Sequence, residues 1–279
     1  MVNIIPMAGV GSRFADAGYV LPKPLVPVSG KPMILQVIRA LPSATQWIFI
    51  VRREHIERYH IDQLIKTAVP HAVIVPIDET TEGQAASCML AMPFVDPRED
   101  VLIAACDNSF VYDEEKFLTL KQDPAIDAVV WTFTKDNLLS EKPEAWGWLQ
   151  LENDGVTISD VSVKKPVSKN PYNDHAVVAT FYFKRAQDFC AAYERMVKEN
   201  YRINNEFYVD SMPIFYKKMG KRSVIFDVDL YVGWGKPSDL YQYEEREYAY
   251  QFLRSADPAA AREMLDGRWV RFFDSLERA

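Results

Sequence analysis

The chain has 279 residues, 48% of them hydrophobic, and a formal net charge of −7 at pH 7. This length suffices for one large buried core, or for one core with a helical appendage. The acidic balance argues against a nucleic-acid partner, because binding a polyanion needs a basic face. No apolar run has the length of a membrane-spanning helix, so we also expect no membrane partner.

The amino terminus and the cysteines favour a cytoplasmic location. The first strand meets Gly9 and Gly11 almost at once, which leaves no long apolar stretch for a signal peptide. Cys88, Cys106 and Cys190 are odd in number and scattered through apolar surroundings, so we expect reduced thiols. No spacing of cysteine and histidine indicates a zinc site.

Strands and helices alternate through the first part of the chain. We expect a strand at residues 2–5, a helix at 31–41, a strand at 47–51, a helix at 56–69, a strand at 72–77, a loop entering a helix at 81–92, and a strand at 101–105. This alternation predicts an α/β fold with a doubly wound, mostly parallel sheet and helices on both faces. Ligands of such sheets bind beyond the carboxyl ends of the strands, where both a glycine-rich turn and Asp107 fall.

The second part of the chain changes character. Strands are expected at residues 128–134, 148–151, 156–163 and 177–183, with helices at 185–200 and 208–219 and a short strand at 223–226. From residue 239 to the end the pattern is mostly helical. We therefore expect the later strands to extend the sheet and the last segment to form a helical tail.

The turn Ala8-Gly9-Val10-Gly11-Ser12-Arg13 has the composition of a phosphate-binding loop. Glycines directly after a strand let the backbone approach a phosphate, and Arg13 and Lys23 add cations for the same anion. The alternative is a tight turn whose basic residues face solvent. Phe14 replaces the third glycine of a dinucleotide fingerprint, and Ser12-Arg13 does not supply the end of a P-loop.

The order of these motifs resembles the nucleotidylyltransferase (NTP-transferase) family, which includes the sugar-1-phosphate pyrophosphorylases. The shared pattern is the glycine turn, a gap of about nine residues, Pro22-Lys23-Pro24, and then Lys31-Pro32-Met33. The resemblance implies a Rossmann-like, GT-A-like mixed sheet. It also implies a catalytic domain at residues 1–238, with a nucleotide half of about 1–125, an acceptor half of about 126–238, and a helical extension at 239–279.

The resemblance assigns nucleotide-binding residues to two segments. The first contributes Ala8, Gly9, Gly11, Ser12 and Arg13. The second, Thr81-Glu82-Gly83-Gln84-Ala85, is similar to the segment that lies over the base and ribose, through Gly83 and Gln84. A helix amino terminus with a capping threonine is an equal alternative for this second segment.

Acceptor-binding residues are implied at three places. Trp146 and Gly147 resemble the aromatic-glycine pair of the sugar pocket. Lys165 occupies the lysine position of the family's Glu-Lys-Pro, with Lys164 in place of the glutamate. Glu206 lies in a segment similar to the one whose carboxylate accepts from sugar hydroxyls.

The resemblance also implies a magnesium ion. Asp107 matches the strand-end Asp-Asn that holds Mg²⁺ in the family, although a helix-capping aspartate is the alternative. Gly233 stands where the family has a second metal aspartate. Either Asp227 or Asp229 substitutes for it, or a single aspartate holds the metal; we assign Asp107 and Asp229.

The implied reaction transfers an NMP from an NTP to a phosphorylated small-molecule acceptor and releases pyrophosphate. Arg13, Lys23 and Asp107 are the implied catalytic residues, and a sugar 1-phosphate feeding surface polysaccharide or glycoconjugate synthesis is the expected acceptor. One alternative is a cytidylyltransferase for a non-sugar phosphate such as phosphocholine. Another is a GT-A-like nucleotide-sugar-binding protein, which the Ser109 in place of Asp-x-Asp disfavours. A homo-oligomer stays an open option.

Overall fold

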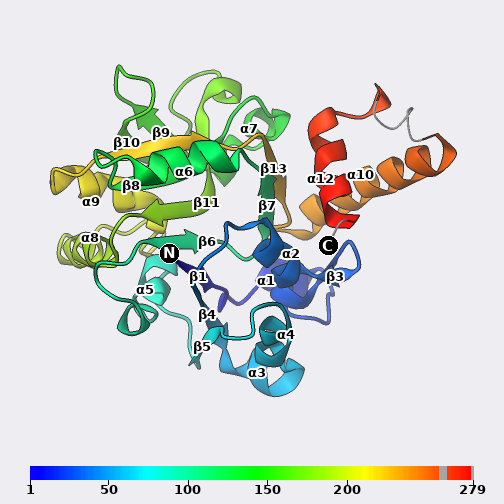
Figure 1. Cartoon of the computed structure of the whole chain (residues 1–279), viewed down its shortest axis with the longest axis horizontal. Coiled ribbons are helices and arrows are strands. Elements are labelled where there is room, and N and C mark those ends of the chain that lie inside the picture. Colours follow the sequence, from blue (N-terminus) through cyan, green and yellow to red (C-terminus); the bar gives the residue numbers. More distant parts are fainter. Residues whose placement is uncertain (258–262, 278–279) are drawn as a thin grey trace. The chain divides into compact units, whose positions relative to one another are not determined.

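The computed structural model describes residues 1–257 and 263–277 (Figure 1). The chain divides into two compact units. The sheet unit consists of Met1–Gly9, Ser43–Ala105 and Glu114–Asp227. The helical unit consists of Val10–Pro42, Cys106–Asp113 and Val228–Ala279. The predicted catalytic domain at residues 1–238 draws on both units, and its boundaries stay a prediction.

The sheet unit is built on a mixed sheet in the order β10-β9-β11-β6-β1-β4-β5 (Figure 1). Its parallel part pairs β1 with both β4 and β6, and β4 with β5. These strands are β1 (Val2–Pro6), β4 (Gln46–Arg52), β5 (Val73–Ile77) and β6 (Val101–Ala104). Because β1 and β6 are parallel neighbours, their carboxyl ends lie side by side at one edge of the sheet.

A long central strand, β11 (His175–Phe183), joins the parallel part to the rest of the sheet. It pairs antiparallel with β6, with β8 (Ala128–Phe133) and with β9 (Gly147–Leu151). Beyond it, β10 (Ile158–Val163) pairs antiparallel with β9, and β12 (Ser223–Asp227) pairs parallel with β8. The predicted extension of the sheet by the later strands is confirmed.

Helices cover both faces of this sheet. Tyr182 and Phe183 are neighbours on β11 and so point to opposite faces. Tyr182 packs against Phe117 of α6 (Glu114–Gln122), with ring centroids 5.8 Å apart. Phe183 packs at 5.0 Å against Phe189 of α8 (Ala186–Lys198), and at 5.3 Å against Tyr216 of α9 (Met212–Lys218). Each buried aromatic ring contributes about 2–3 kcal/mol of hydrophobic stabilisation.

The helices of the sheet unit differ from the sequence prediction in two places. The single helix expected at residues 56–69 is wrong, because α3 (Arg53–Tyr59) and α4 (Ile61–Ala68) are separated by His60. His60 has a left-handed backbone with φ of 51°, which ends α3. The pattern did not predict α6, since Phe117 is its one buried residue and a helical period needs several. The remaining helices of the sheet unit are α5 (Gln84–Met89) and α7 (Asn137–Glu141), with 3₁₀ turns η2 (Met92–Phe94), η3 (Pro143–Ala145), η4 (Pro171–Asn173) and η5 (Val209–Ser211).

The helical unit contains short elements and two longer helices. Its elements are α1 (Ser12–Asp16), η1 (Lys23–Leu25), β2 (Pro27–Val28), β3 (Lys31–Pro32), α2 (Met33–Ala40), β7 (Asn108–Val111), β13 (Leu230–Gly233), α10 (Pro237–Ala256) and α12 (Gly267–Glu277). Tyr243 and Tyr250 of α10 pack against Phe273 of α12 at 5.7 and 5.0 Å. The predicted helical tail is confirmed over α10 and α12, and residues 258–262 and 278–279 lie outside the described part. No helix in the described ranges is both long and apolar enough to cross a lipid bilayer.

Candidate functional site

The glycine turn enters the helical unit at Val10, and the next residue, Gly11, has a left-handed backbone with φ of 66°. A Cβ atom built on Gly11 lies 3.3 Å from the Cβ of Lys23, so glycine allows both the conformation and the close approach. Ser12 and Arg13 follow and are exposed. Ala8 and Gly9 end the preceding stretch of the sheet unit. A Cβ atom built on Gly9 would meet no atom within 4 Å beyond its chain neighbours. The turn therefore combines open backbone with an exposed guanidinium.

Lys23 is held in place by its proline neighbours and by Asp107. Pro22 and Pro24 fix their own backbone angles, and Lys23 begins η1. Its ammonium group makes an ion pair with the carboxylate of Asp107, and both side chains are largely buried. Burial alone would lower the pKa of Lys23, but the adjacent Asp107 outweighs it and raises the pKa above its ordinary value. Lys23 is therefore a cation at neutral pH.

Asp107 lies where β13 returns beside β7. In this antiparallel ribbon Gly233 pairs with Asn108, and the backbone N–H of Trp234 donates to the carbonyl oxygen of Asp107 at 2.8 Å. A Cβ built on Gly235 lies 3.4 Å from Oδ2 of Asp107 and 3.8 Å from Oδ2 of Asp239. The missing side chain of Gly235 thus leaves a small space that two carboxylates face.

The sequence did not single out Asp239. In the structure it is the second carboxylate beside Asp107, and it also pairs with Lys236 at 3.5 Å. Gly233 has its own local reason, because a Cβ there would lie 2.8 Å from the hydroxyl oxygen of Tyr231. The ring of Tyr231 occupies the space that an aspartate at position 233 would need.

The structure does not bring Asp229 to Asp107. Asp229 is exposed and its N–H donates to the carbonyl of Val111, at the other end of the ribbon from the Gly233–Asn108 pair. Three residue steps along a strand correspond to about 10 Å. The second metal ligand assigned from the sequence therefore lies apart from the first.

Asp227, the other alternative, belongs to the sheet unit and has partners of its own. Its Oδ1 accepts from Thr132 Oγ1 at 2.6 Å and lies 2.9 Å from His175 Nδ1. Burial acts to raise the pKa of Asp227, but the contacts with His175 and Thr132 outweigh it, and the pKa lies below its ordinary value. These contacts give Asp227 a structural role at the end of β12.

The donor atoms beside Gly235 fit magnesium. Within the described residues no group of three or more His, Cys, Asp or Glu side chains is placed to hold a metal ion. Two carboxylates are nevertheless enough for Mg²⁺, which is usually completed by phosphate oxygens and water. Asp107 and Asp239 supply hard oxygen donors of this kind, and Gly235 leaves the room between them.

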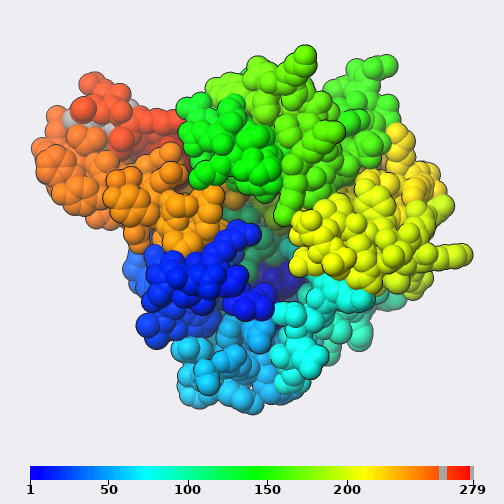
Figure 2. All heavy atoms as spheres, turned by 180° about the vertical axis from the view of Figure 1, so that it is seen from behind, coloured from blue at the N-terminus to red at the C-terminus, as the bar shows by residue number. Residues whose placement is uncertain are grey.

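Gly83 is fixed by close backbone packing in the sheet unit. It has φ of 122°, and a Cβ there would lie 2.6 Å from the backbone nitrogen of Phe207. The N–H of Phe207 donates to Glu82, and the N–H of Ala85 donates to Phe207. Figure 2 shows the corresponding cyan surface, near residues 80–90, adjoining the yellow surface near residue 200. Gly83 and Glu206 are thereby brought together.

The threonine-cap alternative is not the observed arrangement. Gly83, rather than Thr81, precedes α5, and no side chain caps this helix. Thr81 Oγ1 instead donates to the carbonyl oxygen of Gly83 at 2.9 Å and lies 2.6 Å from Ser87 Oγ. Gln84 is the first residue of α5 and is partly exposed.

Trp146, Gly147 and Lys165 also come together. Val163 at the end of β10 pairs with Gly147, and the N–H of Lys164 donates to the carbonyl oxygen of Trp146 at 2.8 Å. Lys165 follows directly and is exposed. The backbone pairing therefore places the aromatic-glycine pair and the lysine at adjacent strand ends.

Asp210 is a member of this group that the sequence motifs missed. A Cβ built on Gly147 lies 3.5 Å from Cγ and Oδ2 of Asp210, so the carboxylate lies against Gly147. Burial raises the pKa of Asp210 to about 6. The motif that points to Glu206 does not include Asp210, which lies four residues further along the chain.

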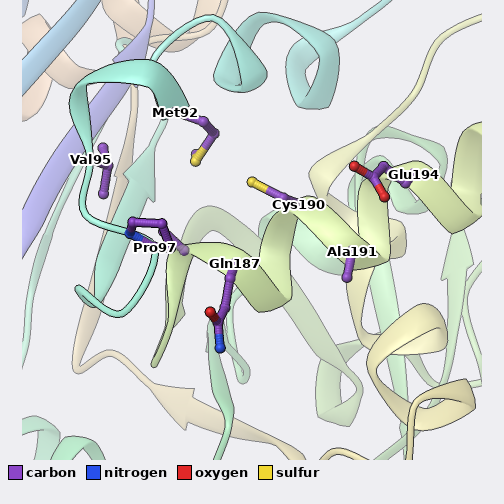
Figure 3. Close-up of a pocket in the computed structure, with 8 residues that line it drawn as sticks. Met92, Val95, Pro97, Gln187, Cys190, Ala191 and Glu194 are labelled. Atoms are coloured by element: carbon purple, nitrogen blue, oxygen red, sulfur yellow. The ribbon is translucent and has the colours of Figure 1, made fainter.

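A separate pocket of about 260 Å³ lies elsewhere in the sheet unit (Figure 3). It is lined by residues of α8 and of the segment around η2, including Met92, Val95 and Cys190. Burial raises the pKa of the Cys190 thiol, so the thiol stays protonated at neutral pH. None of the site residues predicted from the sequence lines this pocket.

Residues 3–136 match the family model of the MobA-like NTP transferase domain. The chain is 33% identical over 103 residues to the bifunctional protein GlmU of Thermotoga petrophila, which covers 37% of this chain and 21% of that protein. It is 26% identical over 159 residues to GlmU of Methanocaldococcus jannaschii, covering 57% of this chain and 35% of that protein. The chain thus spans about a fifth to a third of the length of these relatives. The predicted resemblance to the nucleotidylyltransferases is confirmed.

Solved structures share the fold. A nucleoside-diphosphate-sugar pyrophosphorylase from Vibrio cholerae superposes with a TM-score of 0.70 at 20% identity, covering 87% of this chain and 99% of that one. The inositol-1-phosphate CTP transferase of Thermotoga maritima superposes with a TM-score of 0.67 at 16% identity, covering 87% of this chain and 93% of that one. HddC from Yersinia pseudotuberculosis superposes with a TM-score of 0.61 at 18% identity, covering 88% of this chain and 99% of that one. The predicted α/β fold is confirmed.

Proposed function

From the MobA-like NTP transferase domain that residues 3–136 match, we propose that this protein is a nucleotidylyltransferase. It transfers an NMP from an NTP to a phosphorylated small-molecule acceptor. The observation that carries the proposal is the Lys23–Asp107 ion pair beside the glycine turn at Gly11. A cation for phosphate and a carboxylate for a metal ion are there set next to backbone that a phosphate can approach.

In the proposed reaction an oxygen of the acceptor phosphate attacks the α-phosphorus of the NTP. A new P–O bond forms, the bond between the α-phosphorus and the bridging oxygen breaks, and pyrophosphate leaves with the electron pair. The attacking phosphate is already ionised, so no general base is required. Catalysis then depends on positioning and on neutralising charge at the α-phosphate.

The phosphate-side roles fall to residues around the turn. Arg13 holds the leaving pyrophosphate, and Lys23 exchanges its contact with Asp107 for the α-phosphate. The N–H groups of Gly9, Gly11 and Ser12 offer further donors, with Ala8 preceding them. Gly83 and Gln84 contact the base and ribose, since Gly83 exposes backbone and Gln84 offers both donor and acceptor atoms.

Asp107 and Asp239 would hold magnesium. The ion supplies charge neutralisation at phosphate oxygens when it is bound. We prefer Asp239 to Asp229 as the second ligand, because Asp239 faces the same space beside Gly235. The chain's own contribution is to orient the two carboxylates and to bring Lys23 to them.

The acceptor-side roles fall to Trp146, Gly147, Lys165 and Glu206. Lys165 orients the acceptor phosphate, and the other three residues contact the remainder of the molecule. A sugar 1-phosphate, giving an activated precursor for surface polysaccharide or glycoconjugate synthesis, is the first candidate acceptor. A non-sugar phosphate is the second candidate acceptor. We place the activity in the cytoplasm, as the free thiols of Cys88, Cys106 and Cys190 favour.

The test is pyrophosphate release across a panel of NTPs and phosphorylated acceptors with Mg²⁺. We expect release with at least one pair, and a loss of at least ~100-fold in kcat/KM in Lys23→Ala, corresponding to ~2.7 kcal/mol. Lys66→Ala, on the exposed face of α4, is the matched control and should turn over normally. Binding of a nucleotide sugar without pyrophosphate release from any pair would instead support the nucleotide-sugar-binding alternative.

A further inference from the structure

Asp210 lies within the proposed acceptor-side group, yet the proposed reaction gives it no role. Its carboxylate lies against the backbone of Gly147, whose neighbour Trp146 begins the acceptor motif. Val177 of β11 flanks the same glycine, with Cγ2 at 3.4 Å from the position of a Cβ. The residue is partly exposed, so a small molecule beside Gly147 can reach it.

No cation in the described part of the chain pairs with this carboxylate. Burial alone accounts for its raised pKa of about 6, and the ionisable residues nearest to it in the sequence, Tyr208 and Glu206, are neutral or acidic. Asp210 is therefore ionised at pH 7.5 in surroundings that favour its neutral form. A desolvated charge of this kind gains most from a ligand that brings the opposite charge.

We propose that Asp210 receives an ammonium group of the acceptor. The acceptor is then a small molecule that carries both a phosphate and an ammonium group, such as a phosphorylated amino alcohol or amino sugar. This inference rests on the proposed function, in which Lys165 takes the phosphate. Asp210 takes the other end of the molecule, beside Gly147.

A hydroxyl group in the same place would satisfy the carboxylate less well. It donates one hydrogen bond but leaves the partly buried negative charge without a counter-charge. An ammonium group supplies both the hydrogen-bond donor and the counter-charge.

Two matched acceptor pairs test the proposal. Phosphoethanolamine is compared with 2-hydroxyethyl phosphate, and glucosamine 1-phosphate with glucose 1-phosphate, so that each pair differs in an ammonium against a hydroxyl group. We expect the ammonium member of one pair to have a kcat/KM at least about tenfold higher in the wild-type protein. The pair that shows the preference tells an amino alcohol from an amino sugar.

Variants assign the preference to Asp210. Asp210→Asn keeps the shape and should reduce the preference to less than about twofold, mainly by raising the acceptor KM, with the NTP KM unchanged. Asp210→Glu should restore part of it. Asp160→Asn, an exposed carboxylate on β10, is the control and should keep the full preference.

Failure of the inference is distinguishable from failure of the proposed function. Equal pyrophosphate release with both members of each pair, or a preference that survives Asp210→Asn, overturns the inference and leaves nucleotidylyl transfer intact. No release with any NTP and acceptor overturns the proposed function. In that case calorimetric binding of phosphoethanolamine and 2-hydroxyethyl phosphate still decides, since equal affinities for the two overturn the role of Asp210.

Discussion

At the scale of single residues, Arg13 is the most direct test of the glycine turn. It is exposed directly after the turn, so its loss should leave folding unchanged. We expect Arg13→Ala to lower kcat/KM by at least ~100-fold, or ~2.7 kcal/mol of transition-state stabilisation. Steady-state pyrophosphate release measures this, with Arg58→Ala on the exposed side of α3 as the control. Near-normal turnover of Arg13→Ala would mean that the glycine turn is a structural turn and does not hold the pyrophosphate through Arg13.

The two carboxylates beside Gly235 predict an order of severity among aspartate variants. Asp107→Asn should lose nearly all Mg²⁺-dependent turnover, and Asp239→Asn should lose at least about tenfold. Asp229→Asn should stay within about twofold of wild type, because Asp229 lies at the far end of the ribbon. Titrating turnover against Mg²⁺ measures all three, since a lost ligand also raises the Mg²⁺ concentration needed.

Two results would contradict this order. A severe loss in Asp229→Asn with a mild one in Asp239→Asn would restore the ligand assigned from the sequence. Full wild-type activity in excess chelator would remove the metal assignment altogether.

Asp210 makes a prediction about stability that is independent of turnover. Its pKa rises from 3.8 to about 6 on folding, so the folded state binds the proton more tightly than the unfolded state. The stabilising contribution is complete below about pH 4 and is lost as the pH rises through about 6. The Asp210→Asn variant has no carboxylate to ionise, so it does not lose this stabilisation. Between pH 4 and pH 7.5 the difference in free energy of unfolding between variant and wild type should therefore shift by about 2–3 kcal/mol in favour of the variant.

Urea denaturation at a series of pH values checks this prediction, with Asp160→Asn as the control. A variant that is less stable than wild type at pH 7.5 would show that the carboxylate of Asp210 has favourable partners within the protein. Asp210 would then be structural.

At the scale of elements, the join between α5 and the segment around Phe207 depends on one glycine. An added Cβ at Gly83 would lie 2.6 Å from backbone that cannot move without breaking two hydrogen bonds. We expect Gly83→Ala to lower the free energy of unfolding by about 2–4 kcal/mol. Gly155→Ala is the matched control, because its φ is also positive but the space around it is open, and it should cost only about 1 kcal/mol. A smaller loss at Gly83 than at Gly155 would contradict the close packing.

The elements that the sequence predicted are those in which the pattern of apolar side chains reflects which residues are buried. Residues 47–51 are continuously apolar, and they form part of β4. By contrast, α6 buries Phe117 alone and therefore leaves no helical period, and the break at His60 depends on one backbone angle that no periodicity encodes. Short-range patterns of apolar residues thus predict the sheet and most helices. They do not predict a helix that buries a single residue, or a break that depends on one backbone angle.

The site residues divide in the same way. Gly11, Lys23 and Asp107 stand in short motifs and could be found from the sequence. Asp239 and Asp210 could not, because each is identified by a residue distant in the chain. Asp239 faces the same space beside Gly235 as Asp107, and Asp210 lies against Gly147. Contacts of this kind arise from strand pairing, which a motif does not record.

At the scale of the whole molecule, the chain passes repeatedly between the sheet unit and the helical unit. Removing residues 239–279 would take away Tyr243, whose ring packs 5.6 Å from the fully buried Trp234. We therefore expect residues 1–238 alone to melt at least about 10 °C below the full chain, or to aggregate, since large buried aromatic surface would be exposed. Thermal denaturation of the two proteins tests this. A shortened protein that is as stable and active as the full chain would confirm the domain boundary expected from the sequence.

The segment at residues 203–211 has a consequence for how specificity can change. Near its start Glu206 adjoins Gly83, and near its end Asp210 adjoins Gly147. Under the proposed roles, one short stretch of chain contacts both the part that selects a nucleobase and the part that selects an acceptor. A single insertion or deletion there would move both contacts at once, so the preference for a nucleobase and the preference for an acceptor would change together. Exchanging this stretch as a cassette between related enzymes should then transfer donor and acceptor choice together.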